Sequence, residues 1–96
     1  MTTPVTIFAA HTTNDTTSFA VPALDALRHQ NAVVYIWGTW GAATAKVQVS
    51  PDGVTFFDFP NNSLTANGFV AIPVTCLNAQ IVVSGGTAQS LNAFVL

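Results

Sequence analysis

The sequence predicts an all-β domain, a two-sheet antiparallel sandwich of about eight short strands with a jelly-roll-like topology. Thr, Val, Ile and aromatic residues are abundant, and these residue types favour strands. Gly, Pro, Asn and Asp separate the apolar runs at intervals of roughly 8–12 residues, which is typical of sandwiches and barrels. A chain of 96 residues can bury one hydrophobic core but not two, so we expect a single domain over residues 1–96.

The turn residues divide the chain into eight candidate strands. Between the second and third of these, the segment 22–29 has two interpretations. Pro22 at a first helical position and the spacing of Leu24 and Leu27 suit a two-turn helix, and a looped strand is the alternative. The candidate strands are residues 5–10, 17–21, 32–38, 44–50, 54–59, 68–74, 79–84 and 90–96.

The clearest hairpin joins the fourth and fifth candidate strands. Residues 46–50 alternate polar and apolar side chains, so the two faces of this strand differ in polarity. In the turn over residues 50–53, Pro presets φ at the second position and Gly accepts a left-handed conformation. The returning strand is expected to carry Phe57 and Phe59 on one face and Phe56 on the other.

Charged residues make up only 6% of the chain, against about 25% in an average soluble domain. Half of the residues are hydrophobic and the net charge is −2, which excludes a disordered chain. Arg28 and Lys46 are the only cations, so we expect no nucleic-acid partner. The longest wholly apolar run, residues 32–37, is far shorter than the roughly 18–20 residues of a membrane helix, so no membrane partner is expected.

Groups that could perform catalysis are sparse. A nucleophile, base and orienting acid would require a Ser or Cys76 close to His11 or His29, with an Asp behind the His. Neither His lies in a known local motif, and Cys76 has apolar neighbours of the kind that surround inert thiols. We therefore expect no enzymatic activity and no cofactor.

Metal ligands are also few. A single Cys and two well-separated His residues make a poor zinc site, and one Cys cannot form an intrachain disulfide. Asn14, Asp15 and Asp52 could offer a few oxygen ligands to a structural calcium ion, but turn formation accounts for them more simply. The sequence therefore predicts no metal site.

The aromatic residues around the Gly38 turn are candidates for packing or binding. Tyr35 and Trp37 are two residues apart on one strand, so their side chains share a face, and both are expected to enter the core. Trp40 lies in the turn, where an exposed ring could stack on a sugar or anchor a protein partner. The alternative for Trp40 is that it caps the open end of the sandwich.

The segment 36–56 resembles small virion proteins of tailed bacteriophages. It combines a Gly- and Ala-rich turn at residues 38–44, a strand containing Gln48, a Pro-Asp-Gly turn and a strand that opens with Thr55 and Phe56. Further matches at residues 64–68, 81–87 and 90–93 extend the resemblance over about residues 36–96. The resemblance implies a head decoration (cement) protein or a small fibre- or tail-associated sandwich, and it carries over no catalytic residue. The Val-Ser-Pro-Asp-Gly hairpin also resembles one in galactose-binding-like sugar modules.

We therefore expect a structural virion protein, a capsid decoration protein that binds the major capsid protein and stabilises the assembled head on its outer surface. The few charges leave sheet edges without their usual protection, so we also expect a homo-oligomer, dimer or trimer. The first residues lack the pattern of a secretory leader, which favours synthesis in the host cytoplasm. Two alternatives remain: a carbohydrate-binding module that holds a glycan through Trp40 and loop Asn residues, and a tail or fibre component. The expected partner-binding residues are Pro4, Val5, Ile7, Phe8 and Trp40.

Overall fold

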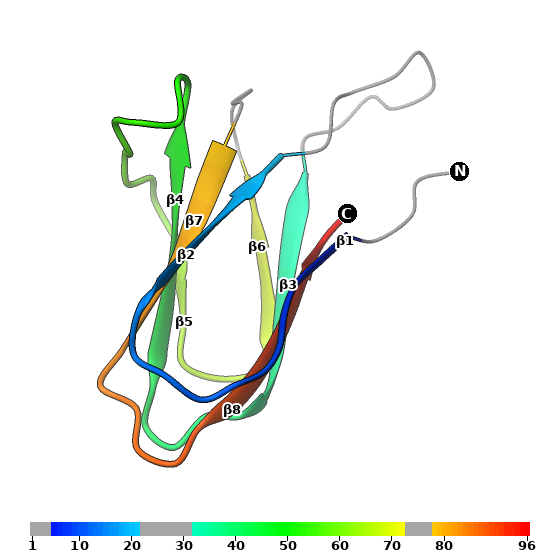
Figure 1. The fold of residues 1–96 in the computed structure, drawn as a ribbon, viewed down its shortest axis with the longest axis vertical. Helices are drawn as coiled ribbons and strands as arrows, with labels where there is room; N and C mark the ends of the chain where they lie inside the picture. Colours follow the sequence, from blue (N-terminus) through cyan, green and yellow to red (C-terminus); the bar gives the residue numbers. More distant parts are fainter. Residues whose placement is uncertain (1–4, 22–31, 73–77) are drawn as a thin grey trace.

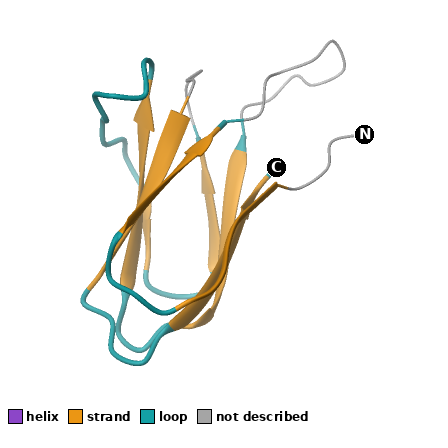
Figure 2. Ribbon diagram, viewed as in Figure 1, coloured by secondary structure: helices purple, strands orange, loops and turns teal. Residues whose placement is uncertain are grey.

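The protein is a sandwich of two antiparallel sheets (Figure 1). The computed structural model describes residues 5–21, 32–72 and 78–96, so the candidate helix at 22–29 and Cys76 lie outside the described residues. Every regular element within the described residues is a strand, joined by loops and turns (Figure 2). The strands are β1 (Val5–His11), β2 (Thr16–Ala20), β3 (Val33–Thr39), β4 (Thr44–Ser50), β5 (Ser63–Leu64), β6 (Gly68–Ala71), β7 (Asn78–Ser84) and β8 (Ser90–Val95).

The strand order is that of a jelly roll. One sheet, which we call sheet A, has the order β1-β8-β3-β6, and the other, sheet B, has the order β2-β7-β4-β5. The chain passes from one sheet to the other at every connection except that between β4 and β5. All the strand pairs are antiparallel. The predicted fold class, a two-sheet antiparallel sandwich of about eight strands, is confirmed.

Most strand positions also agree with the sequence prediction. The strands β1–β4, β7 and β8 begin and end within one residue of their expected bounds. The sixth candidate strand, 68–74, begins as expected at Gly68 but ends at Ala71, and its last two residues lie outside the described residues.

The prediction of a strand at 54–59 is wrong. Only Phe57 pairs with β4 there, through two hydrogen bonds with Val49 of 3.0 and 2.8 Å between N and O. The turn itself explains the difference. The side chain of Asp52 accepts hydrogen bonds from the backbone N–H groups of Val54 and Thr55 through Oδ1, at 2.8 and 3.0 Å. These N–H groups are therefore not free to extend a ladder, and β5 takes the place beside β4.

The core between the sheets is built mainly from small side chains. Most of its buried residues are Ala and Val, and Phe8 is the one aromatic ring among them in the described residues. Small residues let the sheets pack closely and leave little room for large rings. The buried hydrophobic residues are Phe8, Ala32, Val34, Ile36, Ala43, Ala45, Val47, Val49, Val70, Ile72, Ala79, Ile81, Val83, Leu91, Ala93 and Val95.

This core corrects the expectation for Tyr35 and Trp37. The two side chains do share a face, but Val34 and Ile36, both fully buried, occupy the inner face of β3. Tyr35 is half-buried and Trp37 is 40% exposed. Both rings therefore lie on the outer face of sheet A.

Candidate functional site

The outer face of sheet A carries a group of aromatic side chains that we call the aromatic row: Phe69, Tyr35, Phe94 and Trp37. Phe69 of β6 lies opposite Tyr35 of β3, and Tyr35 lies opposite Phe94 of β8. Trp37 is two residues further along β3, on the same face. The row therefore crosses three neighbouring strands of one sheet.

Each ring of the row contacts the next. The ring centroids of Phe69 and Tyr35 are 5.7 Å apart, those of Tyr35 and Phe94 5.3 Å, and those of Phe94 and Trp37 5.2 Å. The last two pairs are edge-to-face, an arrangement that stabilises aromatic pairs beyond the area they bury. The two ends of the row are open, because Phe69 is 61% and Trp37 40% exposed. The row is thus an ordered apolar surface.

The outer face of sheet B is polar instead. Lys46 Nζ lies 3.5 Å from Asp58 Oδ1, which also accepts a hydrogen bond of 3.0 Å from the Gln48 amide. Gln80 on β7 donates a hydrogen bond of 2.6 Å to the side-chain oxygen of Gln48. These contacts hold the pKa of Asp58 below its ordinary value, chiefly through the Gln48 hydrogen bond, with Asn62 and Lys46 contributing.

The charges are distributed unequally between the two sheets. The charged side chains of the described residues are Asp15, Lys46, Asp52 and Asp58, and all of them lie on sheet B or in the loops that adjoin it. None of the strands of sheet A in the described residues carries Asp, Glu, Lys or Arg. The sandwich therefore has one polar outer face and one aromatic outer face.

The structure places the predicted N-terminal contact residues in different environments. Pro4 lies outside the described residues, and Val5 is 50% exposed on β1. Ile7 packs against the core, and Phe8 is buried in it and stacks on the His11 ring at 4.3 Å. Of the described three, Val5 is exposed, Ile7 is partly buried and Phe8 is buried, so a partner role for this segment stays a prediction that rests chiefly on Val5 and Pro4.

Of the two interpretations of Trp40, the structure supports the cap. Its ring is half-buried and packs against the core, as the capping interpretation requires. Its indole N–H donates a hydrogen bond of 2.9 Å to Asn67 Oδ1, and the same oxygen accepts the backbone N–H of Gly38 at 3.0 Å. Trp40 thus ties the β3–β4 loop to the β5–β6 loop, and the more accessible tryptophan is Trp37.

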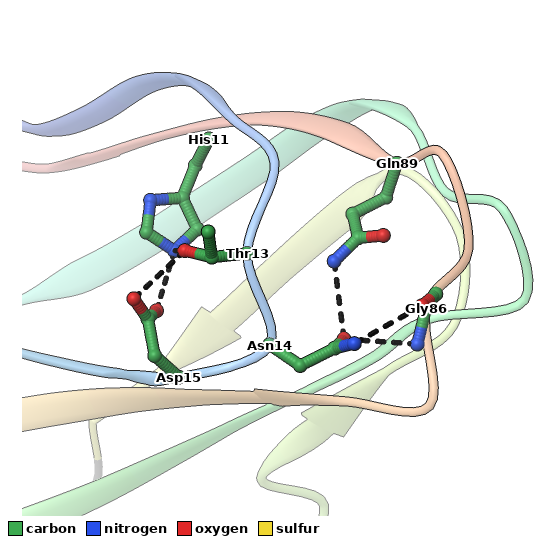
Figure 3. A network of polar contacts seen from close by, with 6 residues as sticks. All are labelled: His11, Thr13, Asn14, Asp15, Gly86 and Gln89. Carbon is green, nitrogen blue, oxygen red and sulfur yellow. Dashed lines mark hydrogen bonds and ion pairs between the residues drawn. The ribbon is translucent and has the colours of Figure 1, made fainter.

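A polar network joins the last residue of β1 to the loop that leads to β2 (Figure 3). His11 Nε2 lies 2.6 Å from Asp15 Oδ1 and 3.2 Å from Thr13 Oγ1. The Thr13 hydroxyl donates a hydrogen bond of 2.7 Å to Asp15 Oδ2. Because a carboxylate only accepts, Nε2 carries the proton in the contact with Asp15. The Thr13 hydroxyl and His11 together hold the pKa of Asp15 below its ordinary value.

This network does not have the geometry of a catalytic relay. A relay uses both ring nitrogens of His, one toward the nucleophile and the other toward the orienting acid. Here Thr13 and Asp15 both contact Nε2, and the hydroxyl proton is already directed at the carboxylate. The arrangement closes the turn between β1 and β2 and thus acts as a structural clamp.

The neighbouring Asn14 links this turn to the loop between β7 and β8 (Figure 3). Its side chain accepts a hydrogen bond from the Gly86 N–H at 2.9 Å and donates one of 3.1 Å to the Gly86 carbonyl. It also accepts a hydrogen bond of 3.0 Å from the amide of Gln89, which is almost completely buried. Asn14 therefore satisfies a buried polar group and holds two loops together.

The described parts of the chain bear on two kinds of site: a cluster of metal ligands and a membrane-spanning helix. No three His, Cys, Asp or Glu side chains among residues 5–21, 32–72 and 78–96 gather into a possible metal site. No helix in these ranges is long and apolar enough to cross a membrane.

The sequence reasoning missed Phe94 and Phe69, and it misassigned their neighbours Tyr35 and Trp37. Because β3 has apolar residues on both faces, its sequence does not show which face is buried. A usable signal was present in β8, where polar Asn92 marks the outer face and Phe94 follows two residues later.

Comparison of the chain with protein-family models, with curated proteins and with solved structures finds no match.

Proposed function

We propose that this protein is a structural subunit of a bacteriophage particle that docks on the assembled head through the outer face of sheet A and bridges neighbouring copies of the major capsid protein. The observation that carries the proposal is the contrast between the aromatic outer face of sheet A and the polar outer face of sheet B. Contiguous exposed apolar surface of this kind is typical of a face that a partner covers. The resemblance of residues 36–96 to phage virion proteins is the reason for proposing a phage particle as the partner.

Docking of this kind stabilises the shell by linkage. A protein that binds the assembled shell but not its dissociated subunits favours the shell by RT ln(1 + [L]/Kd) for each occupied site. Aromatic side chains supply much of the binding energy in protein interfaces, because they bury a large area with few rotatable bonds. Phe69 and Trp37, at the exposed ends of the row, are the expected anchors.

The test is co-sedimentation with heads assembled from the major capsid protein of the same phage, using Phe69→Ser. We expect this change to weaken binding at least about tenfold, as loss of an aromatic anchor does. Phe57→Ser is a matched control, because Phe57 is 53% exposed but lies in the loop beside sheet B. Equal binding by the two variants would contradict docking through sheet A, and failure of the unmodified protein to bind any phage particle would contradict the function itself.

The N-terminal segment adjoins the same face, because Thr6 of β1 lies opposite Phe94. β1 begins at Val5, so deletion of residues 1–4 leaves its sequence intact and tests the predicted contribution of Pro4. Reduced decoration is expected. Full decoration by the shortened chain would remove Pro4 from the proposed contact and leave the aromatic row as the remaining candidate. Cryo-electron microscopy of the particle distinguishes a head position from a tail or fibre position.

A carbohydrate-binding module is the second candidate, since exposed aromatic rings stack on sugars. Directly contacting rings of the row are tilted by 42–64° relative to one another, so they do not form one flat platform. A protein surface, whose side chains can fill the angles between rings, fits this shape better than a flat glycan chain. Glycan-array binding that is lost with Trp37→Ala would favour the carbohydrate function instead.

A further inference from the structure

The edge of sheet B formed by β2 differs from the other sheet edges. It runs in unbroken register with β7 over five residues, from Thr16 opposite Val82 to Ala20 opposite Asn78. At the corresponding edge of sheet A, β1 shows two register shifts, and Ala10 has a left-handed φ of 49°. Such irregularities protect an edge against pairing with another chain. The other two edge strands, β5 and β6, are shorter, at two and four residues.

The backbone groups that β2 directs away from β7 can be identified from the register. The N–H of Val83 donates a hydrogen bond of 2.8 Å to the carbonyl of Asp15, so Asp15 and Val83 form a hydrogen-bonded pair. Hydrogen-bonded and non-hydrogen-bonded pairs alternate along an antiparallel ladder. Thr17 and Phe19 therefore use their N–H and C=O groups toward β7, and Thr16, Ser18 and Ala20 direct theirs toward the open side.

This open edge lacks the features that usually block strand addition. The residues of β2 are Thr, Thr, Ser, Phe and Ala, with no charge and no proline. No described strand pairs with its free side. Thr16, Ser18 and Ala20 are exposed, and their side chains are small. An extended strand could therefore approach the edge without displacing a charged group.

We propose that β2 pairs antiparallel with β2 of a second copy of this chain, across a two-fold axis at Ser18. In this register Ser18 lies opposite Ser18 of the partner subunit, and Thr16 lies opposite Ala20 of the partner subunit. All three outward-directed residues of each copy then fall in hydrogen-bonded pairs, and the two sheets B join into one continuous sheet. The inference uses sheet B alone, so it does not rest on the function proposed for sheet A.

A second copy is the occupant that this edge fits best. The same three residues supply equal numbers of donors and acceptors, so the edge is complementary to itself when the direction is reversed. The strand of the second copy is already ordered by β7, whereas a free peptide would lose conformational freedom on binding. The nearest charge, Asp15, lies just before the strand, and the two-fold register places the two Asp15 side chains at opposite ends of the contact. Among the described residues, no like charges meet across the contact.

Sedimentation velocity and light scattering test the assembly. The unmodified chain is expected to have about twice the 10.0 kDa of a single copy. Ser18→Pro removes an outward-directed N–H without removing a hydrogen bond to β7, so the variant is expected to be a folded monomer. Ser18→Ala keeps the backbone groups and is expected to remain a dimer. A monomeric or trimeric unmodified chain, or a dimeric Ser18→Pro variant, would overturn the proposal.

Cross-linking tests the register and does not require the proline variant to fold. In a Cys76→Ser background, Ser18→Cys is expected to form a disulfide-linked dimer on mild oxidation, because Cα atoms in a hydrogen-bonded antiparallel pair lie about 5.5 Å apart, within disulfide range. Thr16→Cys in the same background is the matched control, since the two-fold register places the two substituted positions four residues out of line. Equal cross-linking of the two variants would overturn the register, and absence of cross-linking in both would overturn the contact.

Discussion

Gly41 gives the most direct test of how the loops at one end of the sandwich are joined. It lies between β3 and β4 with a φ of 53°, and its carbonyl accepts a hydrogen bond of 2.8 Å from the Thr87 N–H. A Cβ at this position would overlap the carbonyl oxygen of Thr87. A left-handed backbone costs a residue with a side chain about 1–2 kcal/mol, and loss of the hydrogen bond adds roughly 0.5–1.5 kcal/mol. We expect Gly41→Ala to reduce the free energy of unfolding by about 2–3 kcal/mol, or roughly 10–20 °C in Tm.

Gly85→Ala is the matched control for the Gly41 variant. Gly85 also has a left-handed φ, 71°, but the nearest atom to an added Cβ is the Ala42 carbonyl oxygen at an ordinary 3.8 Å. Its substitution should therefore cost only the backbone strain of about 1–2 kcal/mol. Urea unfolding followed by tryptophan fluorescence and circular dichroism measures both. Equal losses, or a loss below about 0.5 kcal/mol for Gly41→Ala, would refute the view that close approach of the two loops depends on Gly41.

Three further predictions concern the core, the loop network and acid stability. Phe8→Ala should lower the free energy of unfolding by about 3–5 kcal/mol in urea titrations, because it empties a buried position of the core; a small loss would place Phe8 at the surface. Asn14→Ala should lower the free energy of unfolding by about 1–3 kcal/mol, because it removes the partner of the buried Gln89 amide. Hydrogen exchange at the Gly86 backbone amide should also become faster, and unchanged exchange would contradict this role of Asn14. The pKa of Asp52, held below its ordinary value of 3.8 by the Thr55 and Val54 N–H groups and by Ser50, makes its carboxylate stabilising above that value. This contribution should disappear as the pH falls through and below 3.8, and unfolding midpoints measured from pH 6 to pH 2 should fall less steeply in Asp52→Asn.

The fold could be predicted because local chemistry and global topology agree along most of this chain. In β4, polar and apolar residues alternate in the order that the structure uses, and Gly53 takes the left-handed conformation that the turn prediction requires. The predicted strand at 54–59 was wrong for a reason that composition does not reveal. Ser50 accepts the backbone N–H of Gly53 within the turn, and Asp52 accepts those of Val54 and Thr55 beyond it, which delays pairing until Phe57.

The aromatic row could not be predicted from hydrophobicity, because a large apolar side chain is normally assigned to the core. In β3, both faces of the strand are apolar, so alternation alone does not tell which face is buried. The size of the side chains distinguishes the two faces of β3: Val34 and Ile36 fill the core between the sheets, and the larger Tyr35 and Trp37 lie outside. For Trp40 the sequence left exposure and capping both open, because its loop position does not show that Asn67 provides a partner for its indole.

The position of β8 bears on how the molecule is made. This last strand lies inside sheet A, between the first strand, β1, and β3, and Val95 pairs with both Val5 and Val34. Until β8 has left the ribosome, β1 has no neighbour in its sheet and β3 has only β6. Long sequence separation between contacting strands also slows folding. The apolar strands β1 and β3 therefore remain without their shared neighbour until β8 is in place, and a truncation that removes β8 would divide sheet A in two.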